Sequence, residues 1–339
     1  MKRILITGGA GFVGRRFVRR LLTAGYDVVC VDPVIAGSGG MDPFCGWPLF
    51  EPRDFRGFHY FKQDCRDYLR QHDNEYFDEV YHLAAMVGGR LMIERQPLLV
   101  AEDLSIDAQY WRWAERARPG KSIIFSSSAA YPIKYQRREG YRLLKEEFVD
   151  FGDDIGMPDM TYGWAKLTVE YEARLAYEKH GLESVCYRPF SGYGEDQDLT
   201  YPFPSIFRRA LESRGATRLE VWGTGQQMRD FIHIEDCVDG VLRTKDQVTD
   251  GSAINLSTGV FTSFVELARQ ITQLIGYSPE VVGISDKPEG VFARGGDTTL
   301  QHRLGFRPAI TLAQGIRTSL EYFEQFPLKE SARGAGSGR

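Results

Sequence analysis

The sequence has few cysteines and no long uninterrupted hydrophobic run. Its five cysteines are scattered over 339 residues without any CxxC pairing, so neither a disulfide framework nor a cysteine metal site is predicted. No apolar stretch approaches the ~20 residues that a membrane-spanning helix needs. The apolar run at the start breaks at glycine and is too short for a signal peptide. We therefore expect a cytoplasmic protein with reduced thiols and no membrane partner.

The sequence also lacks an excess of charge of either sign. It has 42 basic and 46 acidic residues and a formal net charge of −4, so no basic surface for nucleic acid is predicted. Its six histidines show no metal-ligand spacing, and we expect no metal. The hydrophobic content of 42% and the charged content of 26% are typical of a globular protein of one large or two ordinary domains.

The first half of the chain alternates between short apolar runs and helical patterns. Continuous apolar strands separated by helices predict an α/β fold, a Rossmann-type doubly wound parallel sheet covered on both faces. The predicted strands are residues 3–8, 27–32, 78–85 and 121–128, and the predicted helices include 14–25 and 106–118. The segment 33–55, rich in glycine, proline and aromatic residues, is predicted to be a long functional loop.

After residue 190 the pattern changes to loops that alternate with short helices and strands. This predicts a smaller α/β substrate domain interleaved with the last strands of the first domain. The expected limits are 1–190 plus about 228–258 for a NAD-binding domain, about 191–227 and 259–326 for a nucleotide-sugar-binding domain, and 327–339 for a disordered tail.

A glycine-rich turn, "TGGAGFVG", follows the first predicted strand and opens the first helix. Gly8, Gly11 and Gly14 have the spacing that permits a tight turn, close approach of the backbone to a pyrophosphate, and packing of the helix on the sheet. Phe12 and Val13 lie at the helix start, where backbone amides attract the anion. Asp32 ends the second strand, where a carboxylate accepts hydrogen bonds from ribose hydroxyls and repels a 2′-phosphate. The pattern predicts NAD rather than NADP.

Two charged features near this turn leave alternatives open. Asp64 follows a third short strand and either contacts the adenine ring or caps the next helix. The arginines of the first helix are expected to form a solvated face, with a phosphate role as the alternative for the first two: Arg15, Arg16, Arg19 and Arg20.

The stretch "TYGWAK" places Tyr162 and Lys166 four residues apart, so on a helix they share a face. A lysine ammonium there lowers the pKa of the tyrosine. Tyr162 can then remove a hydroxyl proton while a hydride leaves the same carbon for NAD. Together with the glycine turn, this pair predicts an oxidoreductase-type active site.

These motifs resemble those of the extended short-chain dehydrogenase/reductases of the sugar-nucleotide epimerase and dehydratase group. The resemblance covers residues 1 to about 326 and includes "HLAA", "YRPFSGYG" and "WGTGQQMRDFIHIEDCVDGV". Within that group the chain is most similar to the GDP-mannose 3,5-epimerases, in "MVGGRLMI", "SSSAAYP" and "PEGVFARGGD". The resemblance implies a NAD-dependent enzyme that acts on a nucleotide-diphosphate sugar, with a GDP-sugar favoured.

The resemblance also implies roles for individual residues. Tyr162, Lys166 and Ser127 match the catalytic group, with Ser127 bonding the sugar hydroxyl that is oxidised. The cofactor positions that it adds are Leu83, Ala84 and Ala85. The substrate positions are Gly88, Gly89, Arg90, Ser128 and Ser191, together with Arg229 and Arg294 as guanidinium ligands of the diphosphate. Aromatic residues on the helix 106–118 are expected in the core or in the two-fold helix bundle of a homodimer.

Two departures from the family pattern decide which reaction is expected. Where the 3,5-epimerases have an acid/base cysteine, this chain has Ala129, and their partner lysine is replaced by Pro202. Dehydratases and decarboxylases of the group usually keep a glutamate at the stretch that here reads Ser128–Ala129. Removal of a proton from carbon needs such a base.

Epimerisation at C4 needs no carbon base, because a hydride leaves C4 and returns to the other face. The sequence therefore favours a 4-epimerase. Two alternatives stay open: a 3,5-epimerase-like enzyme or 4,6-dehydratase with a relocated acid/base, and a NAD-dependent sugar-nucleotide oxidoreductase. The family's asparagine that supports the active-site lysine is also missing from the stretch "DLSIDAQYW".

Overall fold

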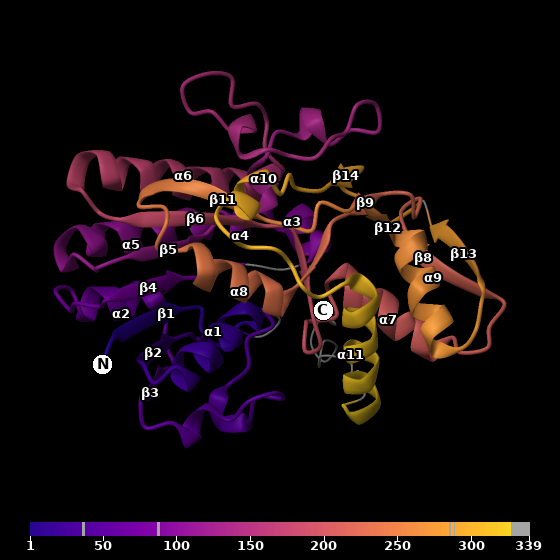
Figure 1. The fold of residues 1–339 in the computed structure, drawn as a ribbon, viewed down its shortest axis with the longest axis horizontal. Coiled ribbons are helices and arrows are strands. Elements are labelled where there is room, and N and C mark those ends of the chain that lie inside the picture. The colour runs from indigo at the N-terminus through magenta and orange to yellow at the C-terminus, as the bar shows by residue number, and fades with distance from the viewer. Residues whose placement is uncertain (36–37, 87–88, 285, 288, 327–339) are drawn as a thin grey trace, which may run out of the picture.

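The computed structural model describes residues 1–326 except 36–37, 87–88, 285 and 288. Gly88 and the predicted tail 327–339 lie outside the described residues. Seven parallel strands form the main sheet, in the spatial order β11 (Asp250–Leu256), β6 (Ser184–Pro189), β5 (Ser122–Phe125), β4 (Glu79–His82), β1 (Arg3–Thr7), β2 (Asp27–Val31) and β3 (Phe58–Phe61) (Figure 1). The predicted α/β fold with a doubly wound parallel sheet is confirmed.

Alternation of side chains along the strands buries both faces of this sheet. Ile4 and Ile6 of β1 join one hydrophobic core, whereas Leu5 joins the other. The first core is covered by α1 (Phe12–Thr23) and α8 (Ile234–Thr244), and the second by α2 (Cys65–Gln71), α5 (Glu102–Ala117) and α6 (Met160–His180). The expected core position of the aromatics on α5 is confirmed, because Tyr110, Trp111 and Trp113 are buried.

A second group of elements has its own hydrophobic core beside the carboxyl end of the sheet. It contains α7 (Pro202–Glu212), α9 (Phe264–Ile275) and α11 (Leu312–Gln325), which lie together with β8 (Arg218–Trp222) and β13 (Glu280–Ile284) to the right of the sheet in Figure 1. The other short elements are β7 (Ser191–Tyr193), β9 (Met228–Arg229), β10 (Phe231–His233), β12 (Thr262–Ser263), β14 (Ala293–Arg294), α3 (Arg90–Arg95), α4 (Pro97–Val100) and α10 (Thr299–Arg303).

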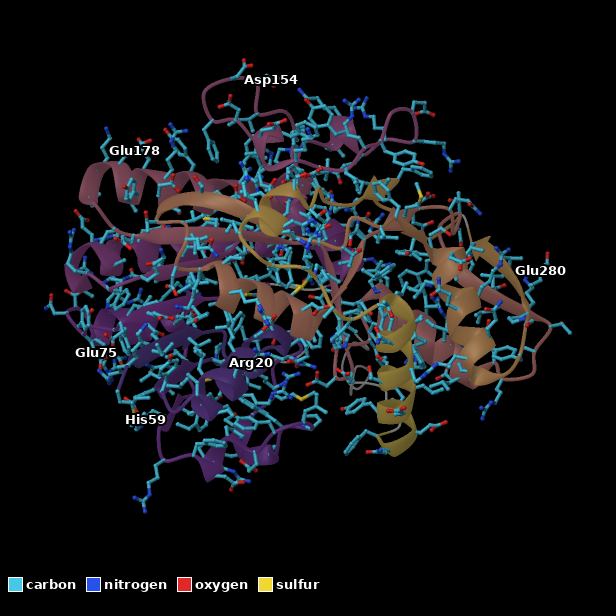
Figure 2. The ribbon with its side chains drawn as sticks, in the orientation of Figure 1. Arg20, His59, Glu75, Asp154, Glu178 and Glu280 are labelled. Atoms are coloured by element: carbon cyan, nitrogen blue, oxygen red, sulfur yellow. The ribbon has the colours of Figure 1, made fainter. Side chains whose placement is uncertain are left out.

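Two irregular segments flank these layers. The predicted loop 33–55 contains the 3-10 helices Pro43–Cys45 and Pro52–Asp54. The segment between η3 (Ser128–Ala130) and α6 projects from the top of the molecule, where Figure 2 labels Asp154. Glu75 and Glu178 are labelled toward the left of Figure 2 and Glu280 at its right, whereas Arg20 lies near the centre of the view. None of the helices in the described part of the chain combines the length and the hydrophobicity needed to cross a bilayer.

Candidate active site

The glycine turn lies against the end of β4 and leaves no room for side chains. Gly8 has a φ of 72°, and an added Cβ would lie 2.8 Å from the backbone nitrogen of Ala84 and 2.9 Å from the carbonyl carbon of Leu83. A Cβ at Gly14 would lie 2.3 Å from the Gly8 carbonyl oxygen. The turn therefore brings together the glycines and the first residues of "LAA", all of which were predicted to contact the cofactor.

Two elements fit polar groups of NAD: the start of α1 fits the pyrophosphate, and the end of β2 fits the hydroxyls of the adenosine ribose. Gly11 precedes α1 and no side chain caps the helix, so the amides of Phe12 and Val13 face the space where a pyrophosphate would be held. Asp32 accepts hydrogen bonds from the backbone nitrogens of Ala10 at 3.1 Å and Val34 at 2.8 Å, which orient its buried carboxylate beside the glycine turn. Burial raises the pKa of Asp32.

Asp64 takes the capping role that the sequence left open. It precedes α2, and its Oδ1 accepts a hydrogen bond from the Arg66 backbone nitrogen at 2.8 Å. The Arg66 guanidinium also pairs with the same carboxylate. A contact between Asp64 and adenine stays a prediction.

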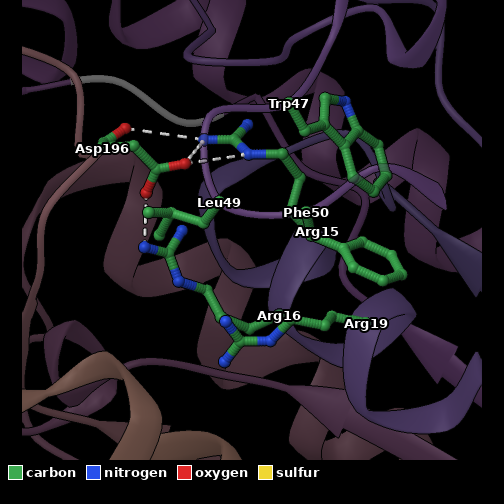
Figure 3. Close-up of a pocket in the computed structure, with 7 residues that line it drawn as sticks. All are labelled: Arg15, Arg16, Arg19, Trp47, Leu49, Phe50 and Asp196. Carbon is green, nitrogen blue, oxygen red and sulfur yellow. Dashed lines mark hydrogen bonds and ion pairs between the residues drawn. The ribbon is translucent and has the colours of Figure 1, made fainter. Parts of the chain in front are cut away.

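The expectation that the arginines of α1 are solvated is wrong for Arg15 and Arg16, whose side chains are 4% and 3% exposed. Both pair with the Asp196 carboxylate, Arg15 at 2.7 Å (Figure 3). Arg15 also donates from Nη1 to the Ala10 carbonyl at 2.7 Å, which ties the glycine turn to the loop after β7. These guanidinium groups can be buried because carboxylates neutralise them. The carboxylates, Glu195 and Asp196, come from a distant part of the chain, so the sequence pattern of α1 does not reveal them.

The predicted catalytic group is brought together at the carboxyl end of β5. Tyr162 and Lys166 share a face of α6, and the Lys166 Nζ lies 5.8 Å from the centre of the Tyr162 ring. Burial raises the pKa of Tyr162, while Lys166 and a hydrogen bond from Ser127 act in the opposite direction. Ser127 begins the short helix η3 and accepts a hydrogen bond from the Ala129 nitrogen at 3.1 Å. The side chains that the sequence predicts to bind and deprotonate one hydroxyl are therefore neighbours, and that role stays a prediction.

The sequence reasoning missed two acids next to the lysine. Asp103 and Asp107 of α5 are buried, and each has one carboxylate oxygen without a hydrogen-bond partner in the described structure. Burial would lower the pKa of Lys166, but these two carboxylates outweigh it and raise that pKa. Asp103 lies in the stretch where the family's asparagine was noted as missing. It also accepts a hydrogen bond from the backbone nitrogen of Met86, just after β4.

A buried polar framework holds the serine segment in place. Ser126 donates to Glu170 of α6, and Arg188 of β6 donates from Nε to the same carboxylate at 2.8 Å. Tyr131 donates to the Asn255 side-chain oxygen at 2.7 Å, so the edge strand β11 anchors the end of the segment. Ala129, between these anchors, is buried and has no ionisable group.

The predicted substrate arginines lie near the start of α6, together with an acid that the sequence reasoning missed. Asp159 pairs with Arg90 at 3.0 Å and with Arg294 at 2.8 Å. Its backbone nitrogen donates to the Ala129 carbonyl at 3.0 Å. Arg229 neighbours this cluster and donates to the carbonyl oxygens of Met228 and Val291.

The remaining predicted substrate residues border the same region. A Cβ at Gly89 would lie 2.2 Å from the Thr200 carbonyl oxygen, so the loop after β4 packs against the segment before α7. Ser191 begins β7 and Ser128 lies in η3. Tyr201 precedes α7, and its partly exposed phenol was missed although it adjoins Pro202. Burial, with a smaller contribution from Tyr162, raises the pKa of Tyr201.

Within the described residues, no three His, Cys, Asp or Glu side chains are grouped to hold a metal ion. All five cysteines are free, and four of them are buried.

The chain was compared with protein families, with curated proteins and with solved structures. Residues 4–257 match the NAD dependent epimerase/dehydratase family. GDP-mannose 3,5-epimerase 1 from Oryza sativa subsp. indica is 27% identical over 340 residues, covering 98% of this chain and 84% of that protein. UDP-glucose 4-epimerase from Mycolicibacterium smegmatis is 28% identical over 336 residues, covering 95% of this chain and 98% of that protein.

Among solved structures, UDP-glucose 4-epimerase from Thermotoga maritima superposes with a TM-score of 0.80 at 24% identity, covering 96% of this chain and 99% of that one. At this identity the likeness shows the fold alone. The matched segment contains the glycine turn, Asp32, Tyr162 and Lys166. The chain therefore belongs to the NAD dependent epimerase/dehydratase family, and it is an enzyme that uses NAD.

Proposed function

We propose that this protein is a 4-epimerase of a nucleotide-diphosphate sugar, with a GDP-linked sugar favoured. The single observation that carries the proposal is the composition of the site around Ser127, Tyr162 and Lys166. These three side chains suffice to bind and deprotonate one sugar hydroxyl. Ala129 and Pro202 stand where a 3,5-epimerase keeps its two groups that exchange protons with carbon.

Two ionisable side chains near Ser127 and Tyr162, those of Asp159 and Tyr201, are poor candidates for a carbon base. Burial would raise the pKa of Asp159, but Arg294 and Arg90 outweigh it and hold that pKa below its ordinary value. A carboxylate with a lowered pKa and two guanidinium partners is a weak base. Tyr201 has a raised pKa and therefore stays protonated near neutral pH. Burial raises the pKa of Tyr162 as well, but there Lys166 and Ser127 act against burial, and no such partner acts on Tyr201. Tyr162 is therefore the base of this proposal.

Each residue of the catalytic group then has one task. Bound NAD supplies the acceptor and donor of the hydride at sugar C4. Tyr162 removes the proton from the C4 hydroxyl and returns it after the sugar has turned. Lys166 stabilises the tyrosinate, and Ser127 holds the sugar oxygen in line.

The proposed substrate also agrees with the charges of the site. Arg229 and Arg294 were assigned to the diphosphate, and Arg90 lies in the same cluster. Guanidinium groups bind phosphate oxygens in pairs. Relatives of this chain include enzymes named for GDP-mannose, GDP-L-fucose and UDP-glucose. These names support a nucleotide-diphosphate sugar as the substrate but do not distinguish guanine from uracil as its nucleobase.

Proton NMR in D2O with a panel of nucleotide sugars tests the proposal. We expect the 4-epimer to form without deuterium on carbon, because the hydride returns to the carbon that it left. Deuterium at C3 or C5 would reject the 4-epimerase in favour of a 3,5-epimerase-like enzyme with a relocated base. Accumulation of NADH in step with substrate loss would instead identify a net oxidoreductase.

A further inference from the structure

Asp159 lies where two predicted substrate arginines meet. Its carboxylate accepts hydrogen bonds from Nη1 of Arg90 at 3.0 and 3.1 Å and from Nη2 of Arg294 at 2.8 Å. The Asp159 side chain is 9% exposed, and those of Arg294 and Arg90 are 13% and 31% exposed. The three groups therefore form a largely enclosed ion cluster that opens on the Arg90 side.

Three guanidinium groups, those of Arg90, Arg229 and Arg294, lie beside two paired carboxylates, those of Asp159 and Glu94. A Cβ added to Gly290 would lie 3.5 Å from both the Arg229 Nη2 and the Arg90 Cζ, so these two guanidinium groups flank one small space. Arg229 donates to backbone carbonyls and makes no ion pair with a carboxylate of the described residues. Burial, with Arg294 and Arg90, lowers the pKa of Arg229 to about 9. The cluster therefore favours a further anion.

Asp159 lies at the N-cap position of α6, but its side chain does not cap the helix. It precedes the first residue of α6, where aspartate usually caps the helix through its side chain. Here the side chain makes no capping hydrogen bond and its carboxylate is directed to the two arginines instead. Tyr162 follows only three residues later, so this acid belongs to the border of the active site rather than to the outer surface.

The guanidinium groups also show what an incoming phosphate must displace. Arg294 uses Nε for the Gln136 side-chain oxygen and Nη2 for Asp159. Arg90 uses Nε for Glu94 and Nη1 for Asp159. A paired contact with phosphate needs two neighbouring N–H groups of one guanidinium. Release of Asp159 would supply such groups on both arginines at once.

We propose that Asp159 is an internal competitor of the substrate: it occupies the place of a phosphate group between Arg90 and Arg294 and is displaced when the diphosphate binds. The inference rests on the proposed function, because it takes the ligand to be a nucleotide diphosphate. Competition of this kind lowers the apparent affinity by the fraction of molecules in which the arginines are free. It would favour release of the product and discriminate against ligands with one negative charge.

Isothermal titration of the full-length, NAD-loaded enzyme tests the inference. The probes are GDP, UDP and inorganic pyrophosphate, and the variant is Asp159→Asn. We expect the variant to bind diphosphates about tenfold more tightly, because the amide is uncharged and competes less strongly with phosphate for the guanidinium groups. Glu280→Gln, which removes one negative charge from the distant strand β13, is the matched control and should leave the affinity unchanged.

The outcomes separate the inference from the proposed function. If diphosphates bind the wild type and bind Asp159→Asn equally or more weakly, Asp159 is a support for the arginines and the inference is wrong. If no diphosphate binds either protein, the proposed substrate class fails and the inference fails with it. Asp159→Ser, measured in the same way, replaces the asparagine variant if the latter does not fold.

Discussion

The active-site lysine is flanked by carboxylates in this chain, which changes its electrostatics. Asp103 is 1% exposed and has one oxygen without a hydrogen-bond partner among the described residues. Its negative charge raises the pKa of Tyr162, adding to the effect of burial and opposing that of Lys166. Lys166 is kept protonated by Asp103 and Asp107. Asp103 therefore keeps Lys166 protonated, but it also raises the pH at which Tyr162 loses its proton and can act as a base.

Replacement of Asp103 by asparagine should shift the pH profile. The variant loses a negative charge near the phenol, so the pKa of Tyr162 falls and the rising limb of kcat/KM moves to lower pH. We expect a shift of about one unit, the lower end of the effect of a nearby charge. A pH profile that stays in place, with only kcat reduced, would show that Asp103 acts through packing.

Replacement of the two neighbouring phenols should have unequal effects. Tyr162→Phe removes the proposed base, and kcat should fall by about a hundredfold to ten-thousandfold. Tyr201→Phe keeps the ring near the same site and should retain most of the activity. Initial rates with the accepted nucleotide sugar measure both variants. Equal losses would mean that the second phenol also transfers a proton, which contradicts a site with one base.

At the scale of elements, local sequence patterns predicted the sheet and the start of the site. Apolar runs placed the first strands, and the glycine spacing placed the turn that packs on Leu83 and Ala84. The i, i+4 spacing placed Tyr162 and Lys166 on one face of α6. These features depend on neighbours in the chain, so the sequence contains enough information for them.

Other features of the site depend on contacts between distant segments. Arg15 and Asp196 are separated by 181 positions, and no periodicity indicates that they meet. Asp159 and Arg294 are separated by 135 positions. A charged residue on a helix is usually exposed, so its burial can be predicted only when its partner is known. The same reason explains why Asp103 was missed.

The pairing of α1 with the loop after β7 should contribute to stability. Asp196→Asn leaves Arg15 buried without a carboxylate partner among the described residues, while Arg16 keeps Glu195 and Glu235. Breaking a buried pair in this way typically costs about 3–5 kcal/mol of unfolding free energy. Urea or guanidinium denaturation measures this loss. Asp239→Asn is the matched control, because it breaks only the more exposed pairs with Arg20 and Arg243 and should cost about 1 kcal/mol or less. Similar losses in both variants would contradict the stabilising role of the buried pair.

At the scale of the whole molecule, exposed apolar side chains occur on three helices that pack on one another, α4, α5 and α6. They are Leu98, Leu99, Leu104, Trp164 and Tyr171. Exposed apolar side chains that gather on one face are typical of protein interfaces. We propose that these side chains form the interface of the homodimer that the family resemblance implies. The domain limits inferred from the sequence remain proposals as well.

Trp164→Glu should therefore dissociate the dimer, because a charge buried in an apolar interface lacks a partner. Light scattering coupled to gel filtration measures the mass of the particle. Phe44→Glu, at an exposed site in the segment after β2, is the matched control and should leave the mass unchanged. A wild-type protein that is monomeric at all concentrations tested would contradict this proposal.

The hydrogen bond between Tyr131 and Asn255 sets an order of events during synthesis. Asn255 also donates to the carbonyl oxygens of Leu144 and Asp297, so it fastens the serine segment to parts of the chain made much later. The two bonded residues are 124 positions apart, which a ribosome crosses in roughly 6–25 s at about 5–20 residues per second. The catalytic pair on α6 emerges within this interval, before its anchor exists. A chain that stops before β11 therefore carries Ser127, Tyr162 and Lys166 but not the side chain that anchors the serine segment.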